Sequence, residues 1–407
     1  MTVASPAGEA RPRSCAWLDR GLIRRLAALL FGLQLAGFLF VVAGTHGWIT
    51  PLDTPVTTDF VSFYAAGTLA DAGTPQLAYD QAAHGSAEEA ATARGVEYRF
   101  FNYPPVFLIL CAALAHLPYL AAFLLFEAAT LGLFLAVACR IAGDRSPTAI
   151  LVLLAFPMVY WTIGLGQNAF LTAALFGAAT LVIDRRPVVA GLLFGALCYK
   201  PHFGLLIPVA LAAGGHWRAF LAAAASAAAL VLLSVALFGT GTWTAFLAAF
   251  TAAPKTYESG RIVFDGFVTP FGAVRLLGGP SPLAYAVQAG ASLTGAVAVF
   301  VTWRRKLSLP VRAAVLASAT LIAVPLALLY ELMLGAIAGA WLVRADPDAN
   351  KLPLALLFVA LVPARPLSQV LHLPIFPLVA LALFALALRQ AWQEIDRSFS
   401  RNARGEL

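Results

Sequence analysis

The chain has 407 residues, of which 61% are hydrophobic and only 12% are charged, and its formal net charge is +7. A soluble globular protein carries about 25% charged residues, so a chain this poor in charge cannot cover a surface that faces water. Disorder requires the opposite balance, and the glycines and prolines follow no collagen-like period. The composition predicts an all-α polytopic membrane protein, because the apolar runs are continuous rather than alternating.

The positive charge lies in short arginine-rich stretches between the apolar runs. This distribution is typical of the cytoplasmic loops of membrane proteins and argues against a face that binds nucleic acid. The four cysteines have no metal-ligand spacing, and three of them lie inside apolar runs, so neither a metal site nor a disulfide framework is predicted.

The first apolar run, 26–42, follows a polar, arginine-rich segment, 1–21. It is longer than the core of a signal peptide and no clean cleavage site follows, so we expect an uncleaved first spanning helix behind a cytoplasmic tail. An N-terminal membrane module would cover 22–238. Within it, 45–102 is predicted to be a long extracytoplasmic loop, because it holds most of the acidic residues outside the termini.

The remaining chain alternates apolar runs with short polar breaks. A second extracytoplasmic loop is predicted at 239–280, C-terminal membrane helices at 281–390 and a cytoplasmic tail at 391–407. We expect about 12 transmembrane helices, within a range of about 10–13. The other apolar runs lie at 104–117, 119–141, 148–163, 168–183, 188–214, 217–238, 281–302, 311–328, 332–343, 352–363 and 373–390.

Twelve straight crossings would place Arg185 and Arg186 outside the cell, against the rule that positive loops stay inside. If 188–214 instead forms a hairpin broken at Lys200-Pro201, these arginines return to the cytoplasmic side. Both arrangements leave the first long loop outside.

The segment 57–67 offers the first candidate for chemistry. On a helix Phe60, Phe63 and Tyr64 share one face, and aromatic faces of this kind settle at the membrane interface. Asp59 would stand at the N-terminal end of that helix. It could cap the helix by accepting backbone N–H bonds, or it could act as a catalytic carboxylate.

Two further motifs interrupt the apolar runs. Paired prolines after Asn102 and Tyr103 mark a helix start, because the first helical turn tolerates proline. These two side chains would then lie in an aqueous mouth as helix anchors or ligand contacts. Gln167 and Asn168 follow two glycines, and their amides could satisfy loop backbone or bind a polyhydroxylated ligand.

Charged residues inside apolar sequence form the last group. Lys200 interrupts a run next to Pro201 and His202, and it could snorkel to the surface or hold a phosphate as a point charge. Tyr330 and Glu331 separate two runs and could contact substrate or cap a helix. For the intramembrane Glu127 we expect a hydrogen bond across helices.

These motifs in this order resemble glycosyltransferase family 87, which belongs to the C-type superfamily of multispanning transferases that use polyprenyl-phosphate sugars. The resemblance rests on Asp-Phe-x-x-Phe-Tyr-x-Ala-Gly from 59, Tyr-Pro-Pro from 103, Gly-Gln-Asn from 166 and Lys-Pro from 200. It covers roughly 57–331, about two-thirds of the chain. A departure occurs at Glu331, where an aspartate would be expected after the tyrosine.

The resemblance implies an inverting transfer of a hexose, most often mannose, from a β-linked polyprenyl-phosphate sugar to a hydroxyl of a lipid or glycan. It implies that Asp59 is the catalytic carboxylate. It also places Lys200 near the donor phosphate, and His202 and Arg261 are the further cationic candidates. Substrate contacts are expected from Phe60, Phe63, Tyr64, Asn102, Tyr103, Gln167, Asn168, Tyr330 and Glu331.

Polyprenyl phosphate leaves as a stable anion, so one carboxylate that takes the acceptor proton suffices and no general acid is required. We therefore expect no cofactor, no obligatory metal and no obligate protein partner. The partners would be the lipid-linked donor, the acceptor and membrane lipids, and the site would face outward from the plasma membrane. A transporter or flippase of a lipid-linked sugar is the alternative function, and a non-catalytic scaffold is a third.

Overall fold

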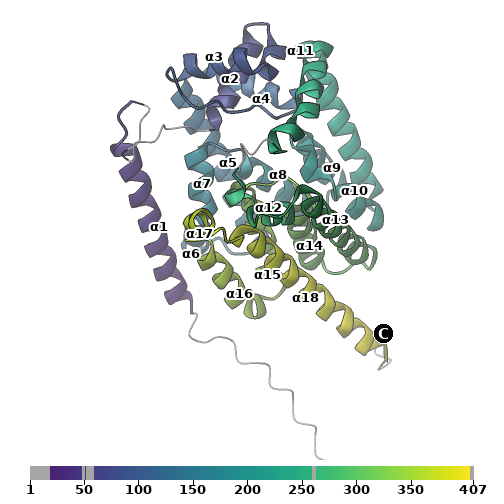
Figure 1. The fold of residues 1–407 in the computed structure, drawn as a ribbon. Helices are drawn as coiled ribbons and strands as arrows, with labels where there is room; N and C mark the ends of the chain where they lie inside the picture. Colours follow the sequence, from purple (N-terminus) through teal and green to yellow (C-terminus); the bar gives the residue numbers. More distant parts are fainter. Residues whose placement is uncertain (1–18, 48–50, 52–58, 259–262, 404–407) are drawn as a thin grey trace, which may run out of the picture.

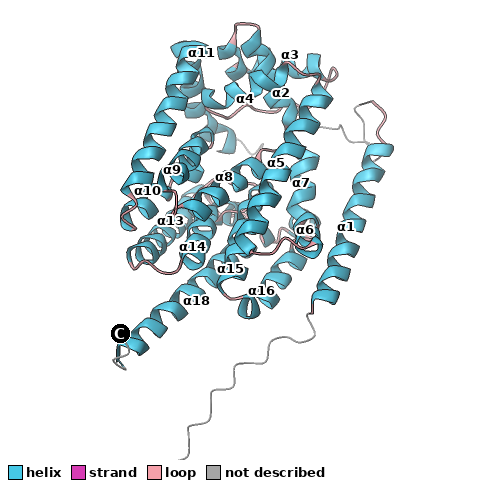
Figure 2. Ribbon diagram, turned by 180° about the vertical axis from the view of Figure 1, so that it is seen from behind, coloured by secondary structure: helices cyan, strands magenta, loops and turns pink. Residues whose placement is uncertain are grey.

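Helices form nearly the whole of the part of the chain that the structure describes. The computed structural model describes residues 19–47, 51, 59–258 and 263–403. It is 81% helical, and these residues contain no strand. The all-α prediction is therefore confirmed, and Figure 2 shows the helices and the short connections between them.

Five helices are long and apolar enough to cross a membrane. Two bent helix pairs, with bends of 57° and 54°, raise the number to seven if each pair counts as one span. The five helices are α1 (Arg20–Ala43), α5 (Tyr119–Ala142), α11 (Trp217–Glu258), α13 (Ser281–Arg304) and α18 (Ile375–Ala403). The bent pairs are α6 (Pro147–Leu154) with α7 (Pro157–Leu165), and α16 (Pro347–Ala360) with α17 (Ala364–Leu371).

The other apolar runs form helices too short to span the bilayer alone. At about 1.5 Å per residue, 15 residues reach only about 22 Å, whereas the hydrocarbon core is about 30 Å thick. For this reason the expected count of about 12 spans is not confirmed and stays a prediction. The short helices are α4 (Pro105–Ala115), α8 (Ala169–Val182), α9 (Pro187–Ala196), α10 (Ile207–Ala213), α14 (Leu309–Ala323) and α15 (Met333–Ala345), with the 3-10 turns η2 (Leu197–Tyr199), η3 (Pro201–Gly204) and η5 (Leu329–Leu332).

The first predicted loop, 45–102, contains substantial helical structure. Its helices are α2 (Phe60–Asp71), η1 (Pro75–Tyr79) and α3 (Gln81–Ala91). They gather with α4 at one end of the molecule (Figure 1). The short helix expected after Asp59 is confirmed as α2. It approaches α4 closely at Gly67, where an added Cβ would overlap the carbonyl oxygen of Cys111.

The predicted loop boundary at 239 coincides with a break in α11, and a further helical segment continues from there to Glu258. The helical path of α11 is interrupted at Gly239, which has φ 76° and ψ 164°. Glycine takes this conformation without the steric cost of a Cβ, so the first helical segment ends here and a second one lies within the predicted loop. The short elements η4 (Phe264–Gly266) and α12 (Pro270–Leu276) follow. At the C-terminus α18 likewise extends to Ala403, through most of the predicted tail.

The arginine-rich turns collect at the end of the molecule opposite to α2–α4, here called the basic end. The start of α1 lies there, with Arg20 Nη2 3.9 Å from Asp144 Oδ2. The end of α15 joins it, because Arg344 Nη1 donates to the carbonyl of Ile141 at 3.1 Å. Figure 1 shows the start of α1 and the end of α18 at this lower end.

The segment 188–214 begins and ends at the basic end of the molecule. Asp184, just before α9, lies 2.5 Å from Arg312 Nη2 and 3.9 Å from Nε2 of His216, just after α10. Of the two arrangements expected for this segment, the contacts support the hairpin. Its turn holds Lys200, and Arg185 and Arg186 lie at the basic end next to Asp184.

Burial divides the helices into a centre and a periphery. In α14 every residue from Val311 to Ala323 is buried, as expected for a helix surrounded by others. By contrast, only 6% of the apolar window of α1 is buried, and the helix stands at the side of the molecule in both views (Figures 1 and 2). The side chain of Gln34 ties α1 to the body, donating to the carbonyl of Ala155 at 2.8 Å.

Small residues bring the hairpin against α11. Gly191 and Gly195 lie one turn apart on α9, and a Cβ at either position would overlap a backbone oxygen of α11, at Ala219 or Ala223. Glycines spaced by four residues allow helix backbones to approach closely in membranes. This contact therefore supports the segment that carries Lys200.

We predict that Gly191→Ala destabilises the protein by about 1–3 kcal/mol, the usual cost of forcing extra volume into a packed interior. Gly290→Ala on α13 is the control, because an added Cβ there meets nothing within 4 Å. Thermal unfolding in detergent micelles measures both. Equal melting temperatures for the two variants would contradict the packing described here.

Candidate functional site

Asp59 stands at the junction of α2 with the end of α7. Its backbone N–H donates to the carbonyl of Leu165 at 2.5 Å, which fixes the start of α2 against that helix. Its side chain makes no capping hydrogen bond to α2 and is 21% exposed. Capping by Asp59, one of the two roles considered from sequence, is therefore excluded, and the carboxylate is directed to other partners.

Two side chains hold the Asp59 carboxylate. Gln167 Nε2 donates to Oδ2 at 2.7 Å, and Arg99 Nε lies 3.7 Å from Oδ1. Burial raises the pKa of Asp59, while the positive charge of Arg99 and the hydrogen bond from Gln167 oppose that rise. A carboxyl group with a raised pKa is a stronger base than a free aspartate, and its partial exposure leaves room for a proton donor.

The backbone conformation and the close packing at residue 166 require the glycine of the Gly-Gln-Asn motif. Gly166 ends α7 with φ 67°, a left-handed conformation that glycine adopts freely. A Cβ at this position would also lie 2.6 Å from the Cβ of Phe60. The glycine thus lets α7 end beside α2 and presents Gln167 to Asp59.

Tyr103 connects the Asp59 region to the hairpin turn. Its hydroxyl donates to Gln167 Oε1 at 3.3 Å. The Nζ atom of Lys200 lies 5.8 Å from the centre of the Tyr103 ring and 5.7 Å from that of Tyr330. Contacts of this length are within the range of cation–π attraction.

Lys200 forms a buried ion pair with Glu331. Lys200 Nζ donates a hydrogen bond to Glu331 Oε1, and the two side chains are only 3% and 5% exposed. The alternative that Lys200 snorkels to the surface is therefore wrong. Glu331 Oε2 is buried without a hydrogen-bond partner among the described residues, so this carboxylate retains unused acceptor capacity.

The aromatic face of α2 lies inside the protein. Phe60 and Phe63 are 0% and 2% exposed and pack in T-shaped contacts with Phe123 and Phe107. The prediction that these rings settle among lipid headgroups is wrong, because the helix is covered by α4 and α5. The Tyr64 hydroxyl donates to the carbonyl of Leu117 at 2.9 Å, a structural contact.

Several other predicted site residues lie apart from these contacts. Asn102 is exposed, and His202 is exposed beside the ring of Phe203. Asn168 is fully buried, and neither of its amide atoms has a hydrogen-bond partner in the described part of the chain. The same is true of both carboxylate oxygens of Glu127, so the hydrogen bond expected there is absent. Arg261 lies outside the described residues.

The structure also brings in charged residues that sequence reasoning missed. Arg99 Nε lies 3.7 Å from the Asp59 carboxylate. The sequence signal that could have identified Arg99 is its position as a cation in an acidic segment just before Tyr-Pro-Pro. Asp265 is buried and pairs with Arg365 at 2.9 Å, and that guanidinium lies 5.9 Å from the centre of the Trp161 ring. Trp161 lies on α7, one turn before the residue that binds the Asp59 backbone.

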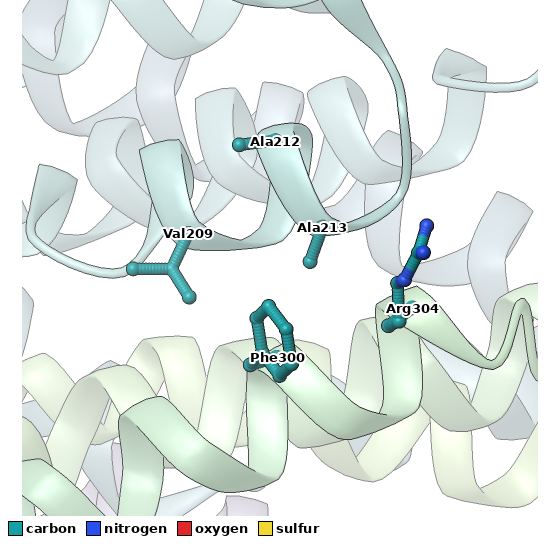
Figure 3. Close-up of a pocket in the computed structure, with 5 residues that line it drawn as sticks. All are labelled: Val209, Ala212, Ala213, Phe300 and Arg304. Carbon is teal, nitrogen blue, oxygen red and sulfur yellow. The ribbon is translucent and has the colours of Figure 1, made fainter.

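A separate hollow of about 300 Å³ lies between α10 and α13. It is lined by Val209, Ala212, Ala213, Phe300 and Arg304, with the arginine at one edge (Figure 3). Its lining has no carboxylate and includes none of the predicted site residues. Within the residues described, no three His, Cys, Asp or Glu side chains are grouped closely enough to hold a metal ion.

A family model for glycosyltransferase family 87 matches residues 100–329, more than half of the chain. The matched range includes Tyr103, Gln167 and Lys200, whereas Asp59 and Glu331 lie outside it. No curated protein and no solved structure matches.

We predict that Lys200→Met destabilises the protein by about 3–5 kcal/mol, because it leaves Glu331 buried as an unpaired charge. The double variant Lys200→Met/Glu331→Met should recover most of this loss, since it removes both charges. Chemical denaturation in mixed micelles measures the three proteins. A double variant as unstable as the sum of the single variants would show that the pair has no energetic coupling.

Proposed function

The chain belongs to glycosyltransferase family 87, and on that basis we propose that it transfers a hexose, mannose as the first candidate, from a polyprenyl-phosphate sugar to a lipid or glycan hydroxyl. Asp59 is the proposed general base. The observation that carries this proposal is its partly exposed carboxylate, which caps no helix and is oriented by Gln167 and Arg99.

The chemistry requires one proton acceptor. As the acceptor hydroxyl attacks the anomeric carbon, its oxygen forms the new C–O bond and its proton passes to Asp59. The bond from that carbon to the phosphate oxygen breaks, and the electron pair leaves with the polyprenyl phosphate. Inversion follows if Asp59 and the phosphate lie on opposite faces of the sugar ring. The step needs neither a general acid nor a metal ion in this proposal.

Lys200 is the proposed cation on the phosphate side. Its ammonium lies 5.8 Å from the centre of the Tyr103 ring, and its charge is balanced by Glu331 before a donor binds. A donor phosphate would approach this pair as a second anion and share the lysine. His202 and Arg261 remain proposals for further phosphate contacts. The remaining predicted substrate contacts are proposals of the same kind.

We infer an extracytoplasmic site in the plasma membrane from the distribution of charge. Arginines gather at the basic end, and positive loops are retained in the cytoplasm. The α2–α4 end, with Asp59, would then face outward. An acceptor and a lipid-linked donor would meet there at the membrane surface.

A flippase of a lipid-linked sugar is the second candidate. The buried Lys200–Glu331 pair among apolar helices favours it, because ion pairs within membranes often mark transport pathways. Such a protein would move labelled donor across proteoliposomes without releasing polyprenyl phosphate. Release of polyprenyl phosphate distinguishes the transferase.

We predict that Asp59→Asn lowers turnover by about 10²–10⁴-fold, the usual contribution of a positioned base. Asp71→Asn, at the other end of α2, is the matched control. The assay measures polyprenyl phosphate released from polyprenyl-phosphate mannose by purified protein in liposomes that contain a cell lipid extract. Normal turnover by the Asp59 variant would disprove the assigned role.

Arg99→Gln should move the acid limb of the pH profile of kcat/KM to higher pH. The base works only when ionised, so activity falls as pH decreases through the pKa of Asp59. Removing the Arg99 charge removes an interaction that lowers this pKa, and the fall then begins at higher pH. Arg94→Gln, an exposed change in the same segment, should leave the limb in place. Coincident profiles for the two variants would contradict the coupling.

A further inference from the structure

A buried histidine–glutamate pair lies behind the Asp59 site and has no part in the proposed reaction. His84 and Glu88 occupy successive turns of α3, and their side chains are 0% and 1% exposed. Nδ1 of the imidazole is 3.5 Å from Oε1 of the carboxyl group. Burial of unpaired charge is costly, so two ionisable groups removed from water in this way must be neutral or interact with nearby partners.

The pair is bonded to both segments that carry the site. His84 Nε2 lies 3.1 Å from the carbonyl oxygen of Ser62, in the first turn of α2. Glu88 Oε2 accepts a hydrogen bond from the backbone N–H of Arg99 at 3.0 Å. Arg99 is the residue whose guanidinium faces Asp59, and Ser62 follows Asp59 by three positions. The pair thus connects the base to its cation from behind.

These contacts determine the number of protons in the pair. A carbonyl oxygen only accepts, so Nε2 of His84 must carry a hydrogen, and Glu88 Oε2 is occupied as an acceptor. A neutral imidazole then presents the lone pair of Nδ1 to Oε1. Both atoms are buried and otherwise have no hydrogen-bond partner among the described residues. Two acceptors facing each other would repel, so one proton must lie between them.

The surroundings favour the neutral form of the pair. Burial raises the pKa of Glu88 to about 7 and lowers the pKa of His84 to about 4. The charge of Asp59 adds to the rise at Glu88, whereas Arg99 opposes it. Between these two pKa values both groups are neutral, so the carboxyl group carries a proton that can point from Oε1 toward Nδ1.

The other titratable groups around α3 do not supply that proton. Tyr98 packs edge-on against the His84 ring, and burial raises the pKa of its phenol further. Asp80 caps the start of α3 through the Ala83 N–H. On η1, the Tyr79 hydroxyl donates to the carbonyl of Tyr103. None of these groups is placed to replace the proton, and losing it leaves a buried carboxylate.

We propose that the His84–Glu88 pair is a positioning element that keeps one proton between Nδ1 and Oε1 and, in this form, holds Arg99 against Asp59. Its effect on catalysis rests on the proposed function. When the proton is lost at alkaline pH, the two facing acceptors repel and the contact between α2 and residue 99 loosens. Transfer should then decline as pH rises.

Infrared spectroscopy tests the proton without any assay of transfer. The carbonyl stretch of a buried carboxylic acid is expected in the wild-type protein below pH 7 and should disappear as pH rises to about 9. Glu88→Gln should remove this band, while Glu89→Gln, an exposed change on the same helix, should retain it. Any band from Glu127 is common to all three proteins. An unchanged band in Glu88→Gln would overturn the proposal.

The pH profile of transfer tests the positioning role. In Glu88→Gln the amide oxygen can accept from Arg99 N–H and the amide N–H can donate to His84 Nδ1, so the variant mimics the protonated acid at every pH. It should retain activity at pH 6 and lose the alkaline decline. Glu88→Ala should lose up to about 10²-fold at both ends of the profile, as for a displaced catalytic group. An alkaline decline in Glu88→Gln equal to that of wild type would contradict the proposal.

The two experiments separate the two claims. If Asp59→Asn leaves turnover unchanged, the proposed function fails, yet the infrared band still reports the state of the pair. If the band is absent from the wild-type protein while Asp59→Asn is inactive, the shared proton is wrong and the transferase assignment stands.

Discussion

The hydrogen bond from Gln167 to Asp59 is the contact on which the site depends. It joins residues 108 positions apart and directs the carboxylate away from its own helix. The backbone bond from Asp59 to Leu165 brings the two helices together, and Gly166 permits their close approach. Because the Gln167 amide oxygen also accepts a hydrogen bond from the Tyr103 hydroxyl, the carboxylate of Asp59 is oriented by a side chain that is itself fixed. Held in this way, a carboxylate needs little reorganisation when a substrate arrives.

The second constraint is the burial of the opposite charges of Lys200 and Glu331. Lys200 lies at the turn of a hairpin, and Glu331 meets it from the segment before α15. Either charge alone would be strongly destabilising in this apolar region, so the two residues are buried together as a pair. Gly191 and Gly195 of α9 pack closely against α11, and this contact holds the hairpin in place. The fold therefore connects Tyr103 both to the Lys200 ammonium, 5.8 Å from its ring, and through Gln167 to Asp59, the proposed base.

Much of the architecture was accessible from sequence, because continuous apolar runs and prolines determine local helices. The start of α2 at Asp59 and the break at Lys200 followed from such patterns. Polar α3 was predicted to be loop, since it has no apolar period, and the helical segment that follows the break at Gly239 was likewise placed in a predicted loop. The partner of Lys200 lies 131 positions away, and no local pattern encodes that pairing. Arg99, which touches Asp59 from an irregular segment, was missed for the same reason.

The most direct test of the central claim is a structure of the protein with a non-transferable polyprenyl-phosphate sugar analogue and an acceptor alcohol. We predict that an Asp59 oxygen lies within about 3.2 Å of the acceptor hydroxyl. We also predict that the donor phosphate lies on the opposite face of the sugar, toward Lys200. A sugar bound with Asp59 on the phosphate side, or with no path from the carboxylate to the anomeric carbon, would contradict these predictions.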